Sequence, residues 1–205
     1  VHSSLTFQDR FQVKSWADRL AGLLNGFGYS EIMTNSISKS KHYQGLGEED
    51  LARIVCLENS MTSELDIMRP SLIPEGLEVI AYNINRKSDN LRLFEFGYTY
   101  SKSGAAYGQR RELAIYFSSP GSLRHWSGDV SQQDFNAFKG LVDAVNKNLK
   151  LSAQSMKAWS GTFAQGQEFM INKKVFLRLG EVLHEAKEQF NINQPVFVAL
   201  FDIDN

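Results

Sequence analysis

The stretch LDIMRPSLIPEGLEVIAYNINR, residues 65–86, combines a helix signal with an arginine placed directly before it. Pro74 suits the first turn of a helix, where the missing N–H of proline costs nothing. We predict a helix from about residue 71 or 74 to residue 85, whose buried face follows the spacing i, i+3, i+4 and i+7: Leu77, Ile80, Ala81 and Ile84. Arg69 precedes a proline and this helix, as if to present its guanidinium to an anionic group in a substrate pocket.

Alternating apolar and polar residues predict strands on both sides of this helix. Residues 91–100, LRLFEFGYTY, alternate sharply, and residues 111–119, RELAIYFSS, follow the segment 101–108. We expect these two strands to form an antiparallel hairpin with a long connection. Other strands are expected at 31–38, 53–57 and 195–204, and other helices at about 6–25, 131–149 and 182–190. Because strands outnumber helices and the loops are short, we predict an α+β fold with an antiparallel β-sheet flanked by three or four helices.

The chain shows no linker and no internal repeat, which predicts a single domain over residues 1–205. It begins at Val1 without a methionine, and we expect it to be excised from a longer chain. In the first predicted helix the apolar stripe is broad: Phe11, Trp16, Leu20, Leu23, Leu24 and Phe27. Such a stripe fits core packing alone, or core packing on one side and a subunit interface on the other.

Composition excludes several classes of protein. The 205 residues carry 22 basic and 23 acidic side chains, a net charge of −1, which does not support a strongly basic nucleic-acid module. No apolar run approaches the length of a membrane span, and we expect no membrane partner. Cys56, the single cysteine, is expected to be buried in the run RIVCL, and a chain without an internal disulfide fits a reducing, cytoplasmic compartment.

Catalytic and metal-binding motifs are not apparent. The 4 histidines are scattered and there is one cysteine, so we predict no metal site and no catalytic residue. Glu75 and Glu78 favour the positive end of the helix at 74–85. Two groups of charges leave alternatives open: Glu181, His184, Glu185 and Glu188 suit an acid–base cluster or a solvated helix face, and the pairs Arg110–Arg111 and Lys173–Lys174 suit edge protection or RNA contact.

The order of several segments resembles the C-terminal half of the bacterial phenylalanyl-tRNA synthetase β chain, over essentially the whole sequence. The segments are FGYSEIMTNSIS, the run ENSMTSELDIMRPSLIPEGLEVIAYNINR, LRLFEFGYTY, DFNAFKG, and LGEV followed by PVFVALFDID. The family pattern has an N-P-x-S loop, then M-R-x-S-L-x-P-x-L-L, N-x-x-R and R-L-F-E-x-G. The matching residues are Asn59, Ser63, Met68, Arg69, Ser71, Leu72, Pro74, Leu77, Asn83, Arg86, Arg92, Leu93, Phe94, Glu95 and Gly97.

This resemblance implies a class II aminoacyl-tRNA synthetase-like module that is itself non-catalytic. Where the α-chain pattern would continue with an arginine that holds ATP, this chain has Tyr100, Ser101 and Lys102, and no Gly-x-Gly-x-Arg motif follows before Asn205. The chain also departs from the β-chain pattern, with AQGQ at 164–167 in place of H-P-G-R and with Leu183 and His184 in place of a histidine and a proline. These departures put the roles of those family residues in doubt here.

The resemblance also implies partners. The module would support the synthetase α subunit in an (αβ)2 heterotetramer that uses ATP and Mg2+ to attach phenylalanine to its tRNA, with no cofactor held by this fragment. The expected contacts to the α chain or in the dimer are Phe11, Trp16, Leu20, Leu23 and Phe27. Arg69 and Glu95 are expected to be structural, Arg69 bonding a carboxylate such as Asp66 or Glu95, or one across in the α chain. The rivals are an adenylate-forming enzyme and a tRNA-binding platform, in which Arg69 would contact tRNA phosphate.

Overall fold

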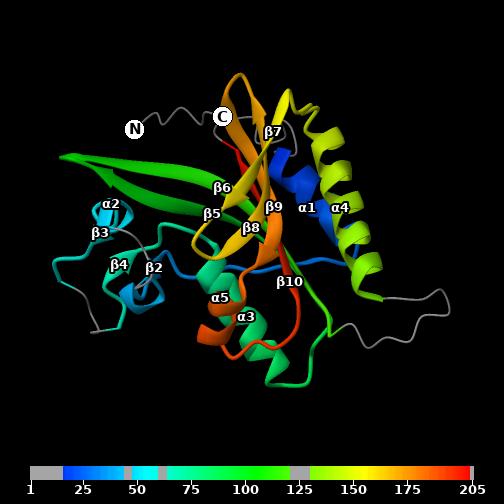
Figure 1. Ribbon diagram of the computed structural model, residues 1–205, viewed down its shortest axis with the longest axis horizontal. Coiled ribbons are helices and arrows are strands. Elements are labelled where there is room, and N and C mark those ends of the chain that lie inside the picture. Colours follow the sequence, from blue (N-terminus) through cyan, green and yellow to red (C-terminus); the bar gives the residue numbers. More distant parts are fainter. Residues whose placement is uncertain (1–15, 44–47, 60–63, 121–129, 204–205) are drawn as a thin grey trace, which may run out of the picture.

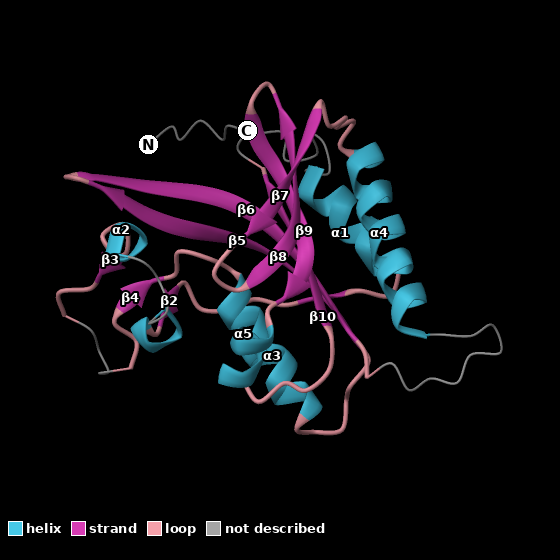
Figure 2. Cartoon of the chain, viewed as in Figure 1, coloured by secondary structure: helices cyan, strands magenta, loops and turns pink. Residues whose placement is uncertain are grey.

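The computed structural model describes residues 16–43, 48–59, 64–120 and 130–203, which form a large sheet with helices on both faces (Figures 1 and 2). The seven strands lie in the order β1-β5-β6-β10-β9-β8-β7, and all pairs are antiparallel except β1 with β5. A small sheet has the order β2-β4-β3. The strands are β1 Ser30–Glu31, β2 Ile37–Ser38, β3 Val55–Cys56, β4 Ile67–Met68, β5 Leu91–Ser103, β6 Ala106–Ser118, β7 Ser155–Ser160, β8 Ala164–Ile171, β9 Lys174–Val182 and β10 Val196–Asp202. The helices are α1 Trp16–Gly26, α2 Glu48–Leu51, α3 Ile73–Ile84, α4 Val130–Asn148 and α5 His184–Gln189, with a short 3-10 helix at Ser40–Tyr43. The predicted fold class is confirmed.

Helix α3 lies where the sequence predicts it, and its packing explains its position. Leu77 and Ile80 are fully buried, and Pro74 occupies the first turn. The helix approaches β6 closely at Gly76, because a Cβ there would lie 2.3 Å from Cζ of the Tyr116 ring. The Tyr116 hydroxyl donates a hydrogen bond of 2.6 Å to the carbonyl of Leu72, directly before the helix. The start of α3 is therefore fixed to the central sheet.

The apolar core is divided by the sheet into two clusters. One cluster packs α3 and α5 against one face of the sheet, and the other packs α1 and α4 against the opposite face (Figure 1). Successive side chains of β6 point to opposite faces of the sheet, so Tyr116 packs in the first cluster and Ile115 in the second. Both faces of the central strands are thus buried.

Three local expectations are wrong. The hairpin has no long connection, because β5 and β6 stay paired as far as Ser103 and Ala106 and turn at Gly104, whose φ is +59°. Residues 101–110 are exposed, and this arm projects from the body (Figure 2). Residues 31–38 do not form one strand, because the segment leaves the large sheet after β1 and enters the small sheet at β2. Cys56 is exposed, since it lies on β3 at the edge of the small sheet.

Within the described ranges, the helices are too short or too polar to cross a membrane.

Candidate functional site

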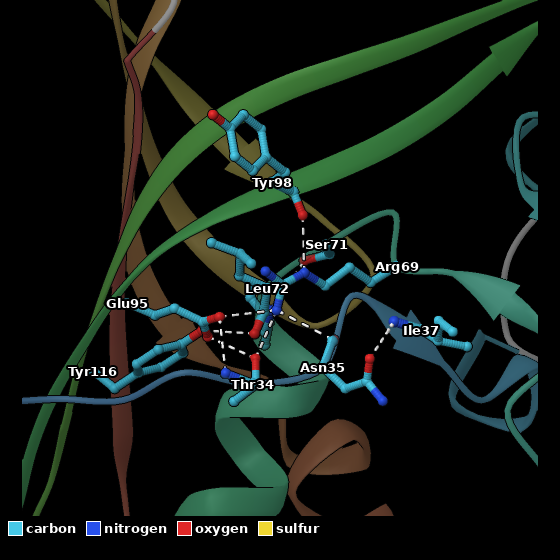
Figure 3. A network of polar contacts seen from close by, with 10 residues as sticks. Thr34, Asn35, Ile37, Arg69, Ser71, Leu72, Glu95, Tyr98 and Tyr116 are labelled. Atoms are coloured by element: carbon cyan, nitrogen blue, oxygen red, sulfur yellow. Dashed lines mark hydrogen bonds and ion pairs between the residues drawn. The ribbon is translucent and has the colours of Figure 1, made fainter.

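Arg69 lies at the centre of a buried polar network (Figure 3). Its Nη1 donates to Glu95 Oε1 at 2.9 Å and to Thr34 Oγ1 at 2.6 Å, and its Nε donates to the Tyr98 carbonyl at 2.8 Å. Thr34 in turn donates to Glu95 from its backbone N–H at 3.1 Å and from its hydroxyl at 2.7 Å. The side chains of Arg69 and Glu95 are only 3% and 2% exposed. Both charges are therefore removed from water and satisfied inside the fold.

This network joins three segments that are distant in sequence. The backbone N–H of Arg69 donates to the Ser36 carbonyl at 3.0 Å, and the Arg69 carbonyl accepts from the Tyr100 N–H at 2.9 Å. The segment before α3 is thereby bound both to the loop between β1 and β2 and to β5. Gly97 on β5 makes room for the guanidinium, because a Cβ there would lie 2.5 Å from Arg69 Nη2.

Of the two candidate partners inside the domain, Arg69 contacts Glu95. Asp66 instead accepts a hydrogen bond of 2.8 Å from the backbone N–H of Ser40. Arg69 does not project into the main cavity described below, which its neighbours Pro70 and Ser71 help to line. The network joins the loop after β1, the segment before α3 and strand β5. Arg69 itself is only 2% exposed, so a ligand has little access to its guanidinium.

A cavity of about 370 Å³, called the main cavity here because Tyr100 and Ser101 line it, is bordered by residues of β5, β6, β9 and β10 and of the segments around α2 and between β7 and β8. Three arginines line it, and each has a carboxylate close by. Arg53 lies 3.9 Å from Asp50, Arg110 lies 3.3 Å from Asp202, and Arg178 lies 3.6 Å from Glu168. Each arginine at the cavity thus has an acidic side chain of the domain beside it, although the buried Nε of Arg178 has no hydrogen-bond partner among the described residues.

Glu112 adds a further carboxylate to this wall. It is 9% exposed and borders both the main cavity and a neighbouring cavity of about 330 Å³. Burial raises the pKa of Glu112 to about 7, and the nearby Arg110 opposes that rise. Across the sheet, Glu112 is paired in register with Gly97 on β5 and with Asp202 on β10.

The positions at which the resemblance places a nucleotide-binding arginine also lie at this cavity. Tyr100 and Ser101 line it. Lys102 is exposed on the projecting hairpin, where its backbone N–H donates to the Arg53 carbonyl at 2.8 Å. A tyrosine and a serine supply no positive charge for a triphosphate.

A second cavity, of about 980 Å³, reveals a buried polar cluster that sequence reasoning missed. Glu75 lies in the first turn of α3, as expected, but it is 6% exposed, and neither of its carboxylate oxygens has a hydrogen-bond partner among the described residues. Burial raises the pKa of Glu75 to about 7, and the Ser38 hydroxyl offsets part of this rise without reaching hydrogen-bond geometry. His42 borders the same cavity, and burial lowers the pKa of its imidazole. No local pattern marks this cluster, because its members come together only in the tertiary structure.

The predicted interface residues have different surroundings. Leu20 is 1% exposed and packs in the domain's own core, so it does not present its side chain to a partner. Trp16 is half-buried against Phe96, with ring centroids 5.9 Å apart. Leu23 is half-buried, and Phe27 is 47% exposed at the end of α1. Phe11 lies outside the described residues.

The remaining charged motifs lie on the surface. His184 and Glu188 are 3.1 Å apart, and their side chains are 76% and 66% exposed. This exposure favours a solvated helix face over an acid–base cluster. Lys173 and Lys174 lie at the turn between β8 and β9. Among the described residues, no group of three or more histidine, cysteine, aspartate or glutamate side chains could hold a metal ion.

Two solved structures with a similar fold are pyrrolysyl-tRNA synthetases. A structure of PylSc, a pyrrolysyl tRNA synthetase from Desulfitobacterium hafniense, matches with a TM-score of 0.69 at 16% identity, covering 92% of this chain and 63% of that one. A second pyrrolysyl-tRNA synthetase structure from the same organism matches with a TM-score of 0.70 at 15% identity, covering 91% and 65%. At this identity the likeness shows the fold, which is the expected class II synthetase-like architecture.

Sequence comparison gives the family. The phenylalanine–tRNA ligase beta subunit of Bacteroides thetaiotaomicron is 27% identical over 215 residues, covering 100% of this chain and 25% of the relative. The corresponding subunit of Bacteroides fragilis is 30% identical over 193 residues, covering 88% and 24%. The chain thus spans about a quarter of the length of the curated relatives it matches. Residues 3–203 match the family described as the phenylalanyl tRNA synthetase beta chain CLM domain, and the chain belongs to that family.

Proposed function

We propose that this chain is a non-catalytic structural module of a phenylalanyl-tRNA synthetase β subunit, which holds the α subunit in place while the complex charges tRNA with phenylalanine. One observation carries the proposal: each arginine that lines the main cavity lies between 3.3 and 3.9 Å from a carboxylate of the domain itself. Adenylate formation needs preorganised cations on the triphosphate, and a guanidinium with its own carboxylate partner offers less to a ligand. ATP and Mg2+ would then act at the α chain.

An ATP-binding measurement tests the proposal that the chain is non-catalytic. Titration calorimetry of the 205-residue chain with ATP and Mg2+ should give no saturable heat, because Tyr100 and Ser101 replace the expected cation at the cavity wall. Saturable binding of ATP that is lost in Arg178→Gln would contradict the proposal and favour an adenylate-forming role.

The partner contact is expected at the C-terminal end of α1, around Phe27. Phe27, directly after the helix, is 47% exposed, and Leu23, one turn earlier, is half-buried against the core cluster that holds Leu20 and Leu24. An exposed aromatic beside a leucine is typical of the few residues that dominate an interface. Trp16 extends this surface at the start of the helix, and we propose the same role for it.

Co-purification with the matching synthetase α chain tests this contact. The wild-type chain should associate stably, and Leu23→Ala combined with Phe27→Ala should lose association while keeping its circular dichroism spectrum. Tyr82→Ala is the matched control, since Tyr82 is 56% exposed on α3, which packs on the other face of the sheet. Equal loss in the control, or no loss in the double variant, would overturn the assignment of α1.

The alternative role, a tRNA-binding platform, predicts strongly salt-dependent binding to tRNA. The basic residues at the root of the projecting hairpin are engaged in the domain: Arg110 lies 3.3 Å from Asp202, and the Arg111 guanidinium lies 5.0 Å from the centre of the Trp16 ring. We therefore expect only weak binding in a gel-shift assay at physiological salt. Tight binding that falls steeply with added salt would favour the platform.

A further inference from the structure

We propose that the main cavity is a binding site for a small organic cation with a flat apolar body, such as an aryl amidinium or aryl ammonium group. The proposed ligand differs in charge from the polyphosphate that a catalytic relative would hold there. The inference does not rest on the scaffold role, because a ligand site and a partner surface on opposite faces of the sheet are compatible.

Glu112 is the group that would bind the cation. Its side chain is more than nine-tenths buried and borders the cavity, and among the described residues it has no ion-pair partner within 4.0 Å. Buried carboxylates are normally paired or hydrogen-bonded. A carboxylate that is buried, unpaired and at the wall of a cavity of about 370 Å³ is the natural partner for a cation that enters it.

The arginines around Glu112 are each paired with a different carboxylate. Arg110 on its own strand lies beside Asp202 on β10, and Arg178 on β9 lies beside Glu168 on β8. The Arg69 guanidinium, which packs on Gly97 across from Glu112, is bound to Glu95. Each of these arginines lies closer to its own carboxylate partner than to Glu112. The arginines therefore compensate the negative charge of Glu112 only in part.

The rest of the lining favours a flat apolar body. Trp159, Tyr100 and Phe163 line the cavity together with Tyr43, whose ring packs edge-on against Phe163 at 5.3 Å. Aromatic faces attract organic cations, tryptophan most strongly. The cavity volume lies in the range of small-molecule sites.

Three probes of the same shape and different charge test the proposal on the 205-residue chain. Benzamidine carries the cation, benzamide is its neutral counterpart, and benzoate carries the opposite charge. By titration calorimetry at pH 8 we expect benzamidine to bind saturably, and benzamide and benzoate to bind about tenfold more weakly or not at all, because a hydrogen-bonded charge pair accounts for a tenfold difference or more.

Glu112→Gln should weaken benzamidine binding about tenfold or more, with the circular dichroism spectrum unchanged. Glu75→Gln is the matched control, since it replaces a second buried glutamate at a different cavity and should leave the affinity unchanged. If Glu112→Gln fails to fold, the wild-type chain supplies the test: its affinity for benzamidine should fall as the pH is lowered from 8 to 5, as the Glu112 carboxyl becomes protonated. Benzamidine remains a cation over this range.

Three results would overturn the proposal. Equal affinity for benzamidine and benzamide would show that charge plays no part. Preference for benzoate would show that the three arginines, and not Glu112, set the selectivity of the cavity. No benzamidine binding at any pH would show that the cavity does not accept a cation. None of these outcomes bears on association with the α chain, so the two proposals fail separately.

Discussion

Replacement of Arg69 by methionine should destabilise the domain while leaving its surface unchanged. Methionine keeps much of the length of the arginine side chain and removes its charge and its donors. The change removes the cation that pairs with Glu95, which is only 1% exposed. It also removes the 2.8 Å hydrogen bond that Arg69 Nε donates to the Tyr98 carbonyl. Removing one member of a buried ion pair costs about 3–5 kcal/mol.

The structure places the expected cost at the lower end of that range. Glu95 would keep two hydrogen bonds after the change, from the Thr34 N–H at 3.1 Å and from the Thr34 hydroxyl at 2.7 Å. Two retained donors reduce the penalty of an isolated carboxylate. We expect Arg69→Met to lower the free energy of unfolding by about 3 kcal/mol, a substantial part of the 5–15 kcal/mol typical of a domain.

Urea unfolding followed by circular dichroism measures this cost, and the dependence on urea concentration should keep its slope. A double-mutant cycle separates the ion pair from packing. Arg69→Met combined with Glu95→Gln removes the stranded charge, so the double variant should be more stable than the sum of the two single changes predicts, by about 1–2 kcal/mol. A cost below about 1 kcal/mol for Arg69→Met, or strict additivity in the cycle, would refute the reasoning that this pair holds the segments together.

Three further changes test the packing around α3, each by urea unfolding. Gly97→Ala should cost about 1–3 kcal/mol, because the new methyl would lie 2.5 Å from Arg69 Nη2, and a neutral result would show that the guanidinium can move. Tyr116→Phe should cost about 1 kcal/mol through loss of the 2.6 Å hydrogen bond to Leu72, whose carbonyl still accepts from the Gly76 N–H at 3.2 Å. The folded-state pKa of Glu75, about 7, lies above its ordinary value of 4.5, so wild-type stability should fall as the pH rises from about 4.5 to 7. Glu75→Gln should therefore stabilise the chain by about 3 kcal/mol at pH 8, since each pKa unit corresponds to about 1.4 kcal/mol. Near pH 4.5 the substitution should have little effect. The same gain at both pH values would contradict the burial of an ionisable carboxyl.

Sequence patterns predict the elements of this fold where one periodicity dominates. The helix expected to end at residue 85 is α3, Ile73–Ile84, and the alternation of LRLFEFGYTY is strand β5. Both signals come from residues that face a core, so the period of the chain and the burial agree. The long connection expected in the hairpin is wrong because polar side chains also occur in a paired, exposed arm, where both faces of the strands meet water.

The candidate site was less predictable than the fold. The broad apolar stripe of the first helix does not show which leucine faces the sheet, and the structure turns Leu20 and Leu24 inward while Phe27 stays exposed. Glu75 and Glu112 look like ordinary surface glutamates in sequence. Their burial depends on neighbours contributed by other segments, such as Ser38 for Glu75 and Arg110 with Asp202 for Glu112.

The two faces of the sheet carry contacts of different kinds. On one face, Phe96 of β5 holds Trp16 of α1 with the ring centroids 5.9 Å apart, and this contact depends on strand geometry and packing. On the other face, Glu112 of β6 and Thr99 of β5 border the cavity, where a change of side chain affects ligands and leaves the opposite face in place. On the role proposed above, the module must keep the sheet and the Arg69 network that binds its edge, whereas the charges that line the cavity can change without altering that support. The fold and the charge of the cavity are thus separate properties of this chain, and they are tested by separate substitutions.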